Sequence, residues 1–202
     1  MIWLDSHHAA AATLPAGWLI ATGARPANLA ERSQLRRETA RRILARQLAT
    51  TPDEITITHE EAGRPLLAGA TGRGLHISLA TRAGVVAVAL APQPVGIDVE
   101  RVDPAAEPPY ATLHPDEAAL LRALDADERP LAFARLWAAK EAYVKALGTG
   151  FLRAPESFAV RLVSAEGFRV EDPAGGRTAS GILRLYENGG QEILAAAMAL
   201  LD

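Results

Sequence analysis

The chain has 202 residues, of which 49% are hydrophobic, and a formal net charge of −3. Cysteine is absent, which excludes disulfides, thiolate metal sites and thiol nucleophiles. The net charge gives no reason to expect nucleic-acid binding, and no apolar run reaches the ~18 residues that a membrane helix needs. The first residues also lack the pattern of a signal peptide. We therefore expect a globular cytoplasmic protein that binds neither nucleic acid nor membrane.

The first half of the sequence predicts one long helix and a set of short strands. Apolar residues recur at helical spacing from about residue 28 to 48, in an arginine-rich stretch. Alternating or continuous apolar runs predict strands on both sides of this helix. These strands cover residues 2–4, 17–20, 55–58, 75–79, 85–90 and 95–99.

Helices followed by strands are predicted again after a proline-rich segment. The segment 103–109 contains three prolines, which fit neither a helix interior nor a central strand, so it is predicted to be a linker. Two helices follow: one begins at Pro115 and the other ends at Gly148, a residue suited to a left-handed cap. Four strands are then predicted at 158–163, 168–170, 182–186 and 192–198.

This order predicts an α+β fold made of two similar halves. We expect a pseudo-dimer in which residues 1–102 and 110–202 each form a lobe with a helix and an antiparallel sheet. Because both lobes belong to one chain, we expect a monomer. A cleft between two lobes is a common place for a ligand, so we expect the active site there.

The two lysines of the chain lie in one predicted helix. They are Lys140 and Lys145, whereas the other nineteen basic residues are arginines. Glu141 stands four residues before Lys145, and such a pair on a helix surface adds only a few tenths of a kcal/mol. That role would not require lysine. Lysine is a compact ammonium that can meet phosphate and exchange a proton, so this helix is the first functional candidate.

A second group of charges lies at the end of a predicted strand. Asp98 and Glu100 alternate with apolar residues and therefore point to the same face. Neighbouring carboxylates repel each other unless a cation lies between them, and Mg²⁺ accepts such oxygen ligands while keeping positions for phosphates. Taken alone, the pair is more typical of a solvated strand end. Together with Glu141 and the two lysines, it favours phosphoryl transfer, which depends on positioning and charge neutralisation.

The two segments together resemble a known family signature. The segment Gly96-Ile-Asp-Val-Glu100, followed by Trp137-x₂-Lys-Glu-Ala-x₂-Lys145-x₂-Gly148-x-Gly150, is similar to the signature pair of the 4′-phosphopantetheinyl transferases of the two-lobed, surfactin-synthetase-activating type. Weaker similarity extends to Glu61–Pro65, Leu75–Ala80 and the arginine-rich stretch 32–46. These enzymes move the phosphopantetheine arm of coenzyme A onto a serine of an apo carrier protein and release adenosine 3′,5′-bisphosphate.

The resemblance implies a role for each signature residue. Asp98, Glu100 and Glu141 would hold Mg²⁺ against the pyrophosphate of coenzyme A, and Glu141 would also serve as the base for the incoming serine. Lys145 and Lys140 would neutralise the phosphates. The partner would be an apo acyl or peptidyl carrier protein, and the sequence does not distinguish between the two.

The nucleotide end of coenzyme A would contact residues of the first half. The resemblance implies Arg64, Ser78 and Arg32 for this role. Two positions depart from the family pattern: Leu79 replaces a histidine that helps to bind phosphate, and His76 replaces an asparagine. In a strand, His76 points away from Leu79 and cannot replace that histidine.

Two alternatives remain open. One is a non-catalytic module that binds coenzyme A or a carrier protein, which Leu79 favours and the intact acidic and lysine set opposes. The other is a different metal-dependent phosphotransferase, for which ATP rather than coenzyme A would compete best for the site.

Overall fold

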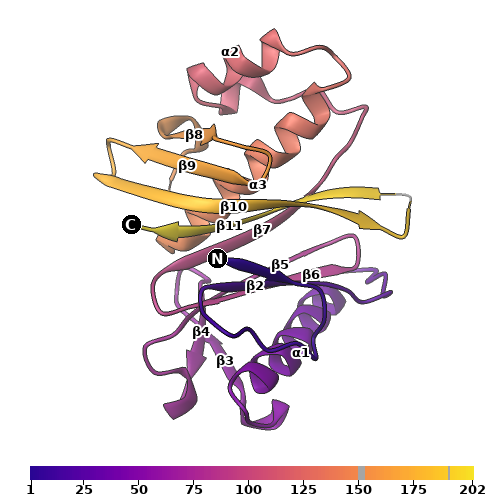
Figure 1. Cartoon of the computed structure of the whole chain (residues 1–202), viewed down its shortest axis with the longest axis vertical. Helices are drawn as coiled ribbons and strands as arrows, with labels where there is room; N and C mark the ends of the chain where they lie inside the picture. The colour runs from indigo at the N-terminus through magenta and orange to yellow at the C-terminus, as the bar shows by residue number, and fades with distance from the viewer. Residues whose placement is uncertain (150–152, 191) are drawn as a thin grey trace.

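Two β-sheets lie between helices in the computed structural model of the chain, which describes residues 1–149, 153–190 and 192–202 (Figure 1). The order of layers is α1, the first sheet, the second sheet and α3. This arrangement is of the α+β class, as predicted. Gly150 of the signature lies outside the described residues. No helix in the described ranges is long and apolar enough to cross a membrane.

The first sheet has the strand order β1-β2-β6-β5, and a separate hairpin, β3-β4, lies beside it. The strands are β1 (Ile2–Leu4), β2 (Ala16–Ala21), β3 (Thr56–His59), β4 (Pro65–Ala68), β5 (His76–Arg82) and β6 (Val85–Ala91). The strand β4 was not predicted. The neighbours β2, β6 and β5 are antiparallel, whereas β1 joins β2 in parallel.

The helix α1 (Leu29–Gln47) covers the first sheet and confirms the helix predicted in the arginine-rich stretch. Its first turn is capped because the Asn28 side chain accepts a hydrogen bond from the Glu31 amide at 2.9 Å. Its apolar side, including Ile43 and Leu44, is fully buried against residues of the sheet such as Val88. The arginines are left on the other sides of the helix.

The second sheet has the strand order β7-β11-β10-β9-β8 and is antiparallel throughout. Its strands are β7 (Val95–Arg101), β8 (Ala159–Leu162), β9 (Gly167–Asp172), β10 (Arg177–Asn188) and β11 (Glu192–Leu201). Two helices accompany it, α2 (Pro115–Ala123) and α3 (Arg129–Leu147). The short 3₁₀ turns are η1 (Pro52–Glu54), η2 (Ala70–Gly72), η3 (Tyr110–Thr112) and η5 (Pro155–Ser157).

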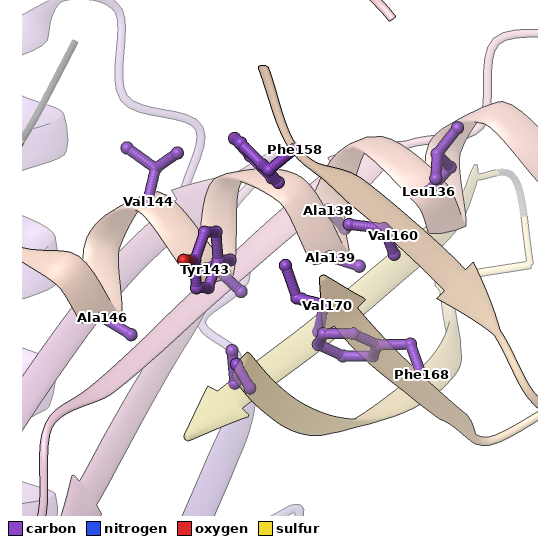
Figure 2. Close-up of a cluster of buried hydrophobic side chains, with 14 of the residues drawn as sticks. Leu136, Ala138, Ala139, Tyr143, Val144, Ala146, Phe158, Val160, Phe168 and Val170 are labelled. Atoms are coloured by element: carbon purple, nitrogen blue, oxygen red, sulfur yellow. The ribbon is translucent and has the colours of Figure 1, made fainter. Parts of the chain in front are cut away.

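The helix α3 packs along the second sheet through small and aromatic side chains (Figure 2). Ala139 and Tyr143 are fully buried there, against Phe158, Phe168 and Val170. The helix stops at Gly148, whose φ of +71° gives the predicted left-handed cap. Nine of its 19 residues are buried, so α3 is held on several sides and its orientation is tightly determined.

The strand β7 lies in a different place from the one that we predicted. We assigned it to the first half, but it pairs with β11 from Val95 to Arg101 and forms an edge of the second sheet. The physical reason is its apolar face: Ile97 and Val99 bury themselves between the two sheets with Leu19 of β2. Strand β7 therefore lies where the two sheets meet, with α3 on its other face.

Candidate active site

A glycine allows α3 to lie against β7. A Cβ atom at Gly96 would overlap the Ala142 carbonyl oxygen and lie 2.6 Å from the Ala146 amide nitrogen, both on the backbone of α3. Only a residue without a side chain permits this approach. The close packing brings the polar face of β7 next to Glu141 and Lys145.

This packing allows an ion pair between the two signature segments, formed by Lys145 and Asp98. Lys145 Nζ donates a hydrogen bond of 2.6 Å to Asp98 Oδ1 and another of 3.2 Å to the Ile97 carbonyl. The Lys145 side chain is 33% exposed and the Asp98 side chain 10%, so the pair lies at the mouth of a cavity. A lysine has three N–H donors, and one of the three remains for another acceptor.

Three carboxylates share this region. Burial raises the pKa of Glu141, and the negative charge of Asp98 raises it further while Lys145 opposes the effect. Burial also raises the pKa of Glu100, with added repulsion from Asp98 and Glu141. Arg82 reaches Glu100 at 3.4 Å and partly offsets this repulsion. The carboxylates therefore stand close enough to repel one another, and a cation among them would relieve the repulsion.

The donor set fits a hard divalent cation, although the side chains are not yet grouped as ligands. Within residues 1–149, 153–190 and 192–202, no three acidic or histidine side chains are close enough to hold a metal as they stand. However, Asp98 Oδ2 is buried without a hydrogen-bond partner. A buried carboxylate oxygen without a partner is costly, and oxygen ligands of this kind suit Mg²⁺.

Two neighbouring cavities flank this ion pair. The first has a volume of about 190 Å³ and is lined by residues from both halves of the chain, among them Arg64, Ser78, Leu79, Lys145 and Gly148. The second has a volume of about 380 Å³. Its lining includes Arg32, Arg36, Arg82, Asp98, Glu100 and Lys145. Because Lys145 and Arg36 line both cavities, the two cavities adjoin each other.

The first cavity contains two of the residues implied for nucleotide binding. Arg64 makes two hydrogen bonds to Glu60, at 3.0 and 2.8 Å, and its guanidinium packs over Gly148 at the end of α3. A positive charge is favourable at that end of a helix. Ser78 is buried, and its hydroxyl accepts a hydrogen bond of 3.0 Å from the Ile97 amide. Ser78 therefore joins the two sheets as well as lining the cavity.

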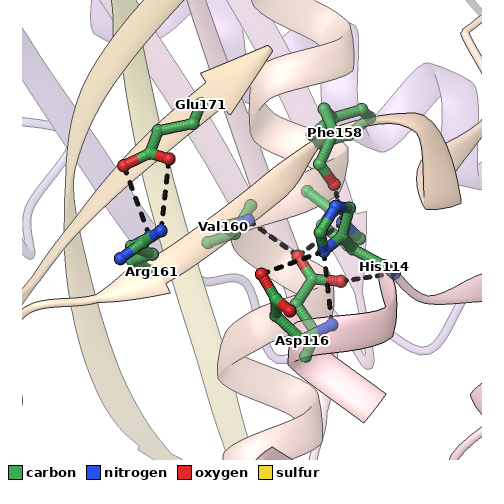
Figure 3. Close-up of polar contacts among 8 residues, drawn as sticks. His114, Asp116, Phe158, Val160, Arg161 and Glu171 are labelled. Carbon is green, nitrogen blue, oxygen red and sulfur yellow. Dashed lines mark hydrogen bonds and ion pairs between the residues drawn. The ribbon is translucent and has the colours of Figure 1, made fainter. Parts of the chain in front are cut away.

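The structure does not bring Lys140 to the cavities. Its side chain is 1% exposed, and its Nζ donates to Glu117 Oε1 at 2.6 Å and to the Phe158 carbonyl at 2.9 Å. The Val160 amide donates to the same carboxylate at 2.7 Å (Figure 3). Burial lowers the pKa of Lys140, while Glu117 opposes the shift. The expectation of a phosphate contact is corrected: Lys140 ties α3 to α2 and β8 inside the core.

The sequence interpretation also missed site residues. Arg36 lines both cavities and His59 lines the first. Arg36 was one of many arginines in its helix, and the only available signal was helical spacing: it lies one turn after Arg32. Gly96 was recognised as part of the signature, but its role in admitting α3 became visible only from the packing.

Comparison with known proteins gives consistent matches. A sequence model of the 4′-phosphopantetheinyl transferase superfamily matches residues 94–196, which include the carboxylates and Lys145. The 4′-phosphopantetheinyl transferase Sfp of Bacillus subtilis is 32% identical over 123 residues, covering 60% of this chain and 54% of that protein. The 4′-phosphopantetheinyl transferase HetI of a Nostoc species is 30% identical over 122 residues, covering 57% and 51%. The chain thus spans about half the length of these relatives.

Proposed function

Because this chain belongs to the 4′-phosphopantetheinyl transferase superfamily, we propose that it transfers the 4′-phosphopantetheine arm of coenzyme A to a serine of an apo carrier protein. The observation that carries the proposal is the meeting of Asp98, Glu100, Glu141 and Lys145 between two adjoining cavities. Such a set of carboxylates and one ammonium suits phosphoryl transfer, which depends on positioning and charge neutralisation.

Coenzyme A would lie across the two cavities as substrate. Its nucleotide end would occupy the first cavity beside Arg64 and Ser78. Arg32 would contact it from the adjoining second cavity. Its pyrophosphate would meet Lys145, the lysine that lines both. Lys145 is already oriented by Asp98 and by the Ile97 carbonyl, so one N–H can donate to a phosphate oxygen without a large loss of side-chain entropy.

Asp98, Glu100 and Glu141 are the residues that would hold Mg²⁺. When bound, the ion neutralises charge on the pyrophosphate and lowers the barrier to nucleophilic attack at phosphorus. Two observations support a cation at this place. Asp98 Oδ2 is buried without a hydrogen-bond partner, and the pKa values of Glu100 and Glu141 are raised.

Glu141 would accept the proton of the carrier serine. Its pKa is raised by burial and by Asp98, which brings the carboxylate closer to the basicity that a general base needs near neutral pH. The serine oxygen forms a bond to the β-phosphorus of coenzyme A as the bridging P–O bond breaks. The electron pair of that bond leaves with adenosine 3′,5′-bisphosphate, whose charge Lys145 stabilises.

We further propose that the two halves act as the lobes of a monomeric pseudo-dimer in the cytoplasm. The support is the repeated order of helix and sheet and the position of the first cavity, which residues of both halves line. Since β7 belongs to the second sheet, the boundary between the lobes would fall before residue 95 and not at 102, with 103–109 as a connection inside the second lobe.

A non-catalytic coenzyme A module is the second candidate, and Leu79 is the observation that favours it. Leu79 is buried, lines the first cavity and offers no donor to a phosphate. The two candidates are separated by incubating the chain with coenzyme A, Mg²⁺ and an apo carrier protein and by measuring coenzyme A affinity in parallel. Binding without any mass gain on the carrier would favour the module, whereas mass gain establishes transfer.

A further inference from the structure

Arg36 lines both cavities, and it forms no ion pair with any of the residues that the structure describes. It lies on α1, and its Nε is buried with no hydrogen-bond partner in the ranges that the structure describes. Two other arginines that line the cavities have acidic partners: Arg64 pairs with Glu60, and Arg82 with Glu100. A guanidinium that is partly withdrawn from water without an anion is unfavourable, and it is relieved when an anion binds.

The neighbours of Arg36 increase this cost. Burial lowers the pKa of Arg36, and the positive charges of Arg37 and Arg32 lower it further. No carboxylate contributes to the shift. The position is therefore one where a negative charge is missing in the ligand-free chain.

The location of Arg36 identifies the kind of anion. Arg36 and Lys145 are the two residues that line both cavities. In the first cavity, Arg36 shares the wall with Leu79, the residue that stands where the family has a phosphate-binding histidine. The arginine comes from α1, which packs on β5, the strand that carries Leu79. Arg36 of α1 can thus donate hydrogen bonds in the part of the first cavity where Leu79 of β5 offers no donor.

We propose that Arg36 binds a phosphate group of coenzyme A and supplies the contact that Leu79 cannot make. This inference rests on the proposed function, because it takes coenzyme A as the ligand. A guanidinium can donate two parallel hydrogen bonds to a phosphate, which a histidine cannot.

The test compares Arg36→Met with Arg37→Met by isothermal titration of coenzyme A in Mg²⁺ buffer. Methionine keeps an apolar stem, and Arg37 is an exposed neighbour whose loss changes the net charge equally. We expect Arg36→Met to weaken binding by about tenfold or more, as for the loss of a charge-assisted hydrogen bond. We expect Arg37→Met to weaken it by less than about threefold, because exposed charges interact weakly.

Two further readouts separate a ligand contact from a structural role. Without ligand, Arg36→Met should melt at the same temperature as the wild type or higher, because an unpaired cation has been removed. Adding Leu79→His to Arg36→Met should recover part of the affinity. Repeating the titration with 3′-dephospho-coenzyme A identifies the phosphate: if Arg36 contacts the 3′-phosphate, the wild type and Arg36→Met bind this analogue equally, and if it contacts the pyrophosphate, the difference persists.

The outcomes distinguish this inference from the proposed function. If the wild type binds coenzyme A and Arg36→Met binds it equally well, or no worse than Arg37→Met, the role of Arg36 is refuted and the proposed function stands. A loss of ligand-free stability that matches the loss of affinity would also refute it. If the wild type binds no coenzyme A, the proposed function fails and the role of Arg36 fails with it.

Discussion

Replacing Gly96 by alanine tests whether the close contact between β7 and α3 builds the site. The new Cβ would enter the space of the Ala142 carbonyl and the Ala146 amide, the two groups that a helix pairs in one of its hydrogen bonds. To move the Cβ from 2.6 Å to an ordinary distance of 3.4 Å from the Ala146 nitrogen, α3 must shift by at least about 0.8 Å, and the Ala142 carbonyl oxygen, which is closer still, requires a larger shift. The backbone cannot rotate away as a side chain can.

Two consequences follow from this shift. Overpacking a well-packed core costs about 1–3 kcal/mol, and contact with backbone places Gly96→Ala near the upper end of that range. A displacement of about 1 Å in a catalytic group can lower the rate by about 100-fold. We therefore expect Gly96→Ala to lose most transfer activity even under conditions in which it remains folded.

The assay is urea unfolding together with initial rates of carrier modification, with Gly167→Ala as the matched control. Gly167 also lies in a strand, but its Cβ would meet the Ser164 and Val163 side chains at 3.3 Å and the Gly181 carbonyl oxygen at an ordinary 3.8 Å. Where space allows, alanine in a strand is favoured over glycine by about 0.5–1 kcal/mol. The control should thus be nearly neutral. A Gly96→Ala variant as stable and as active as Gly167→Ala would refute the role of the close contact.

The remaining predictions concern the charged residues. Glu141→Gln should abolish transfer. It should also make the metal-free chain more stable at pH 7, because the pKa of Glu141 is higher in the folded chain than its usual value of 4.5. Such a carboxyl destabilises the fold increasingly as the pH rises above 4.5. The gain in melting temperature should shrink as pH falls toward 4.5, and an equal gain at all pH values would contradict the assigned cause. Lys145→Arg should lose much of the transfer rate while keeping the charge, because the planar fork cannot replace a compact ammonium that bonds both Asp98 and the Ile97 carbonyl; unchanged rates would contradict this. Lys140→Met should lower the free energy of unfolding by about 3–5 kcal/mol, because it leaves Glu117 buried without its partner. If Lys140→Met instead loses transfer with full stability in urea, the original assignment of Lys140 to phosphate binding is restored.

Local patterns predicted the secondary structure well because they act over a few residues. The apolar spacing that predicts α1 and the glycine at 148 that ends α3 are both readable from neighbours in the sequence. The strand β4 was missed because Pro65-Leu-Leu-Ala68 is short and begins with proline. The placement of β7 in the second sheet depends on pairing with β11, a partner nearly a hundred residues away, and no local pattern encodes that choice.

The candidate site was predictable only in part for the same reason. Asp98, Glu100, Glu141 and Lys145 were predicted from the joint spacing of two segments, and the structure brings the two segments together. Lys140 belongs to the same motif, but its burial is decided by Glu117 of α2, which the motif does not include. Arg36 differs from other arginines of α1 only in what it faces, and that depends on how the helix packs on the sheet.

The most direct test of the proposed function is the intact mass of an apo acyl carrier protein and of an apo peptidyl carrier protein after incubation with this chain, coenzyme A and Mg²⁺. We predict a gain of one phosphopantetheine group on at least one carrier, suppressed by EDTA and absent with Glu141→Gln. No gain on either carrier, with coenzyme A bound in a parallel titration, would contradict transfer and leave a chain that binds coenzyme A without using it.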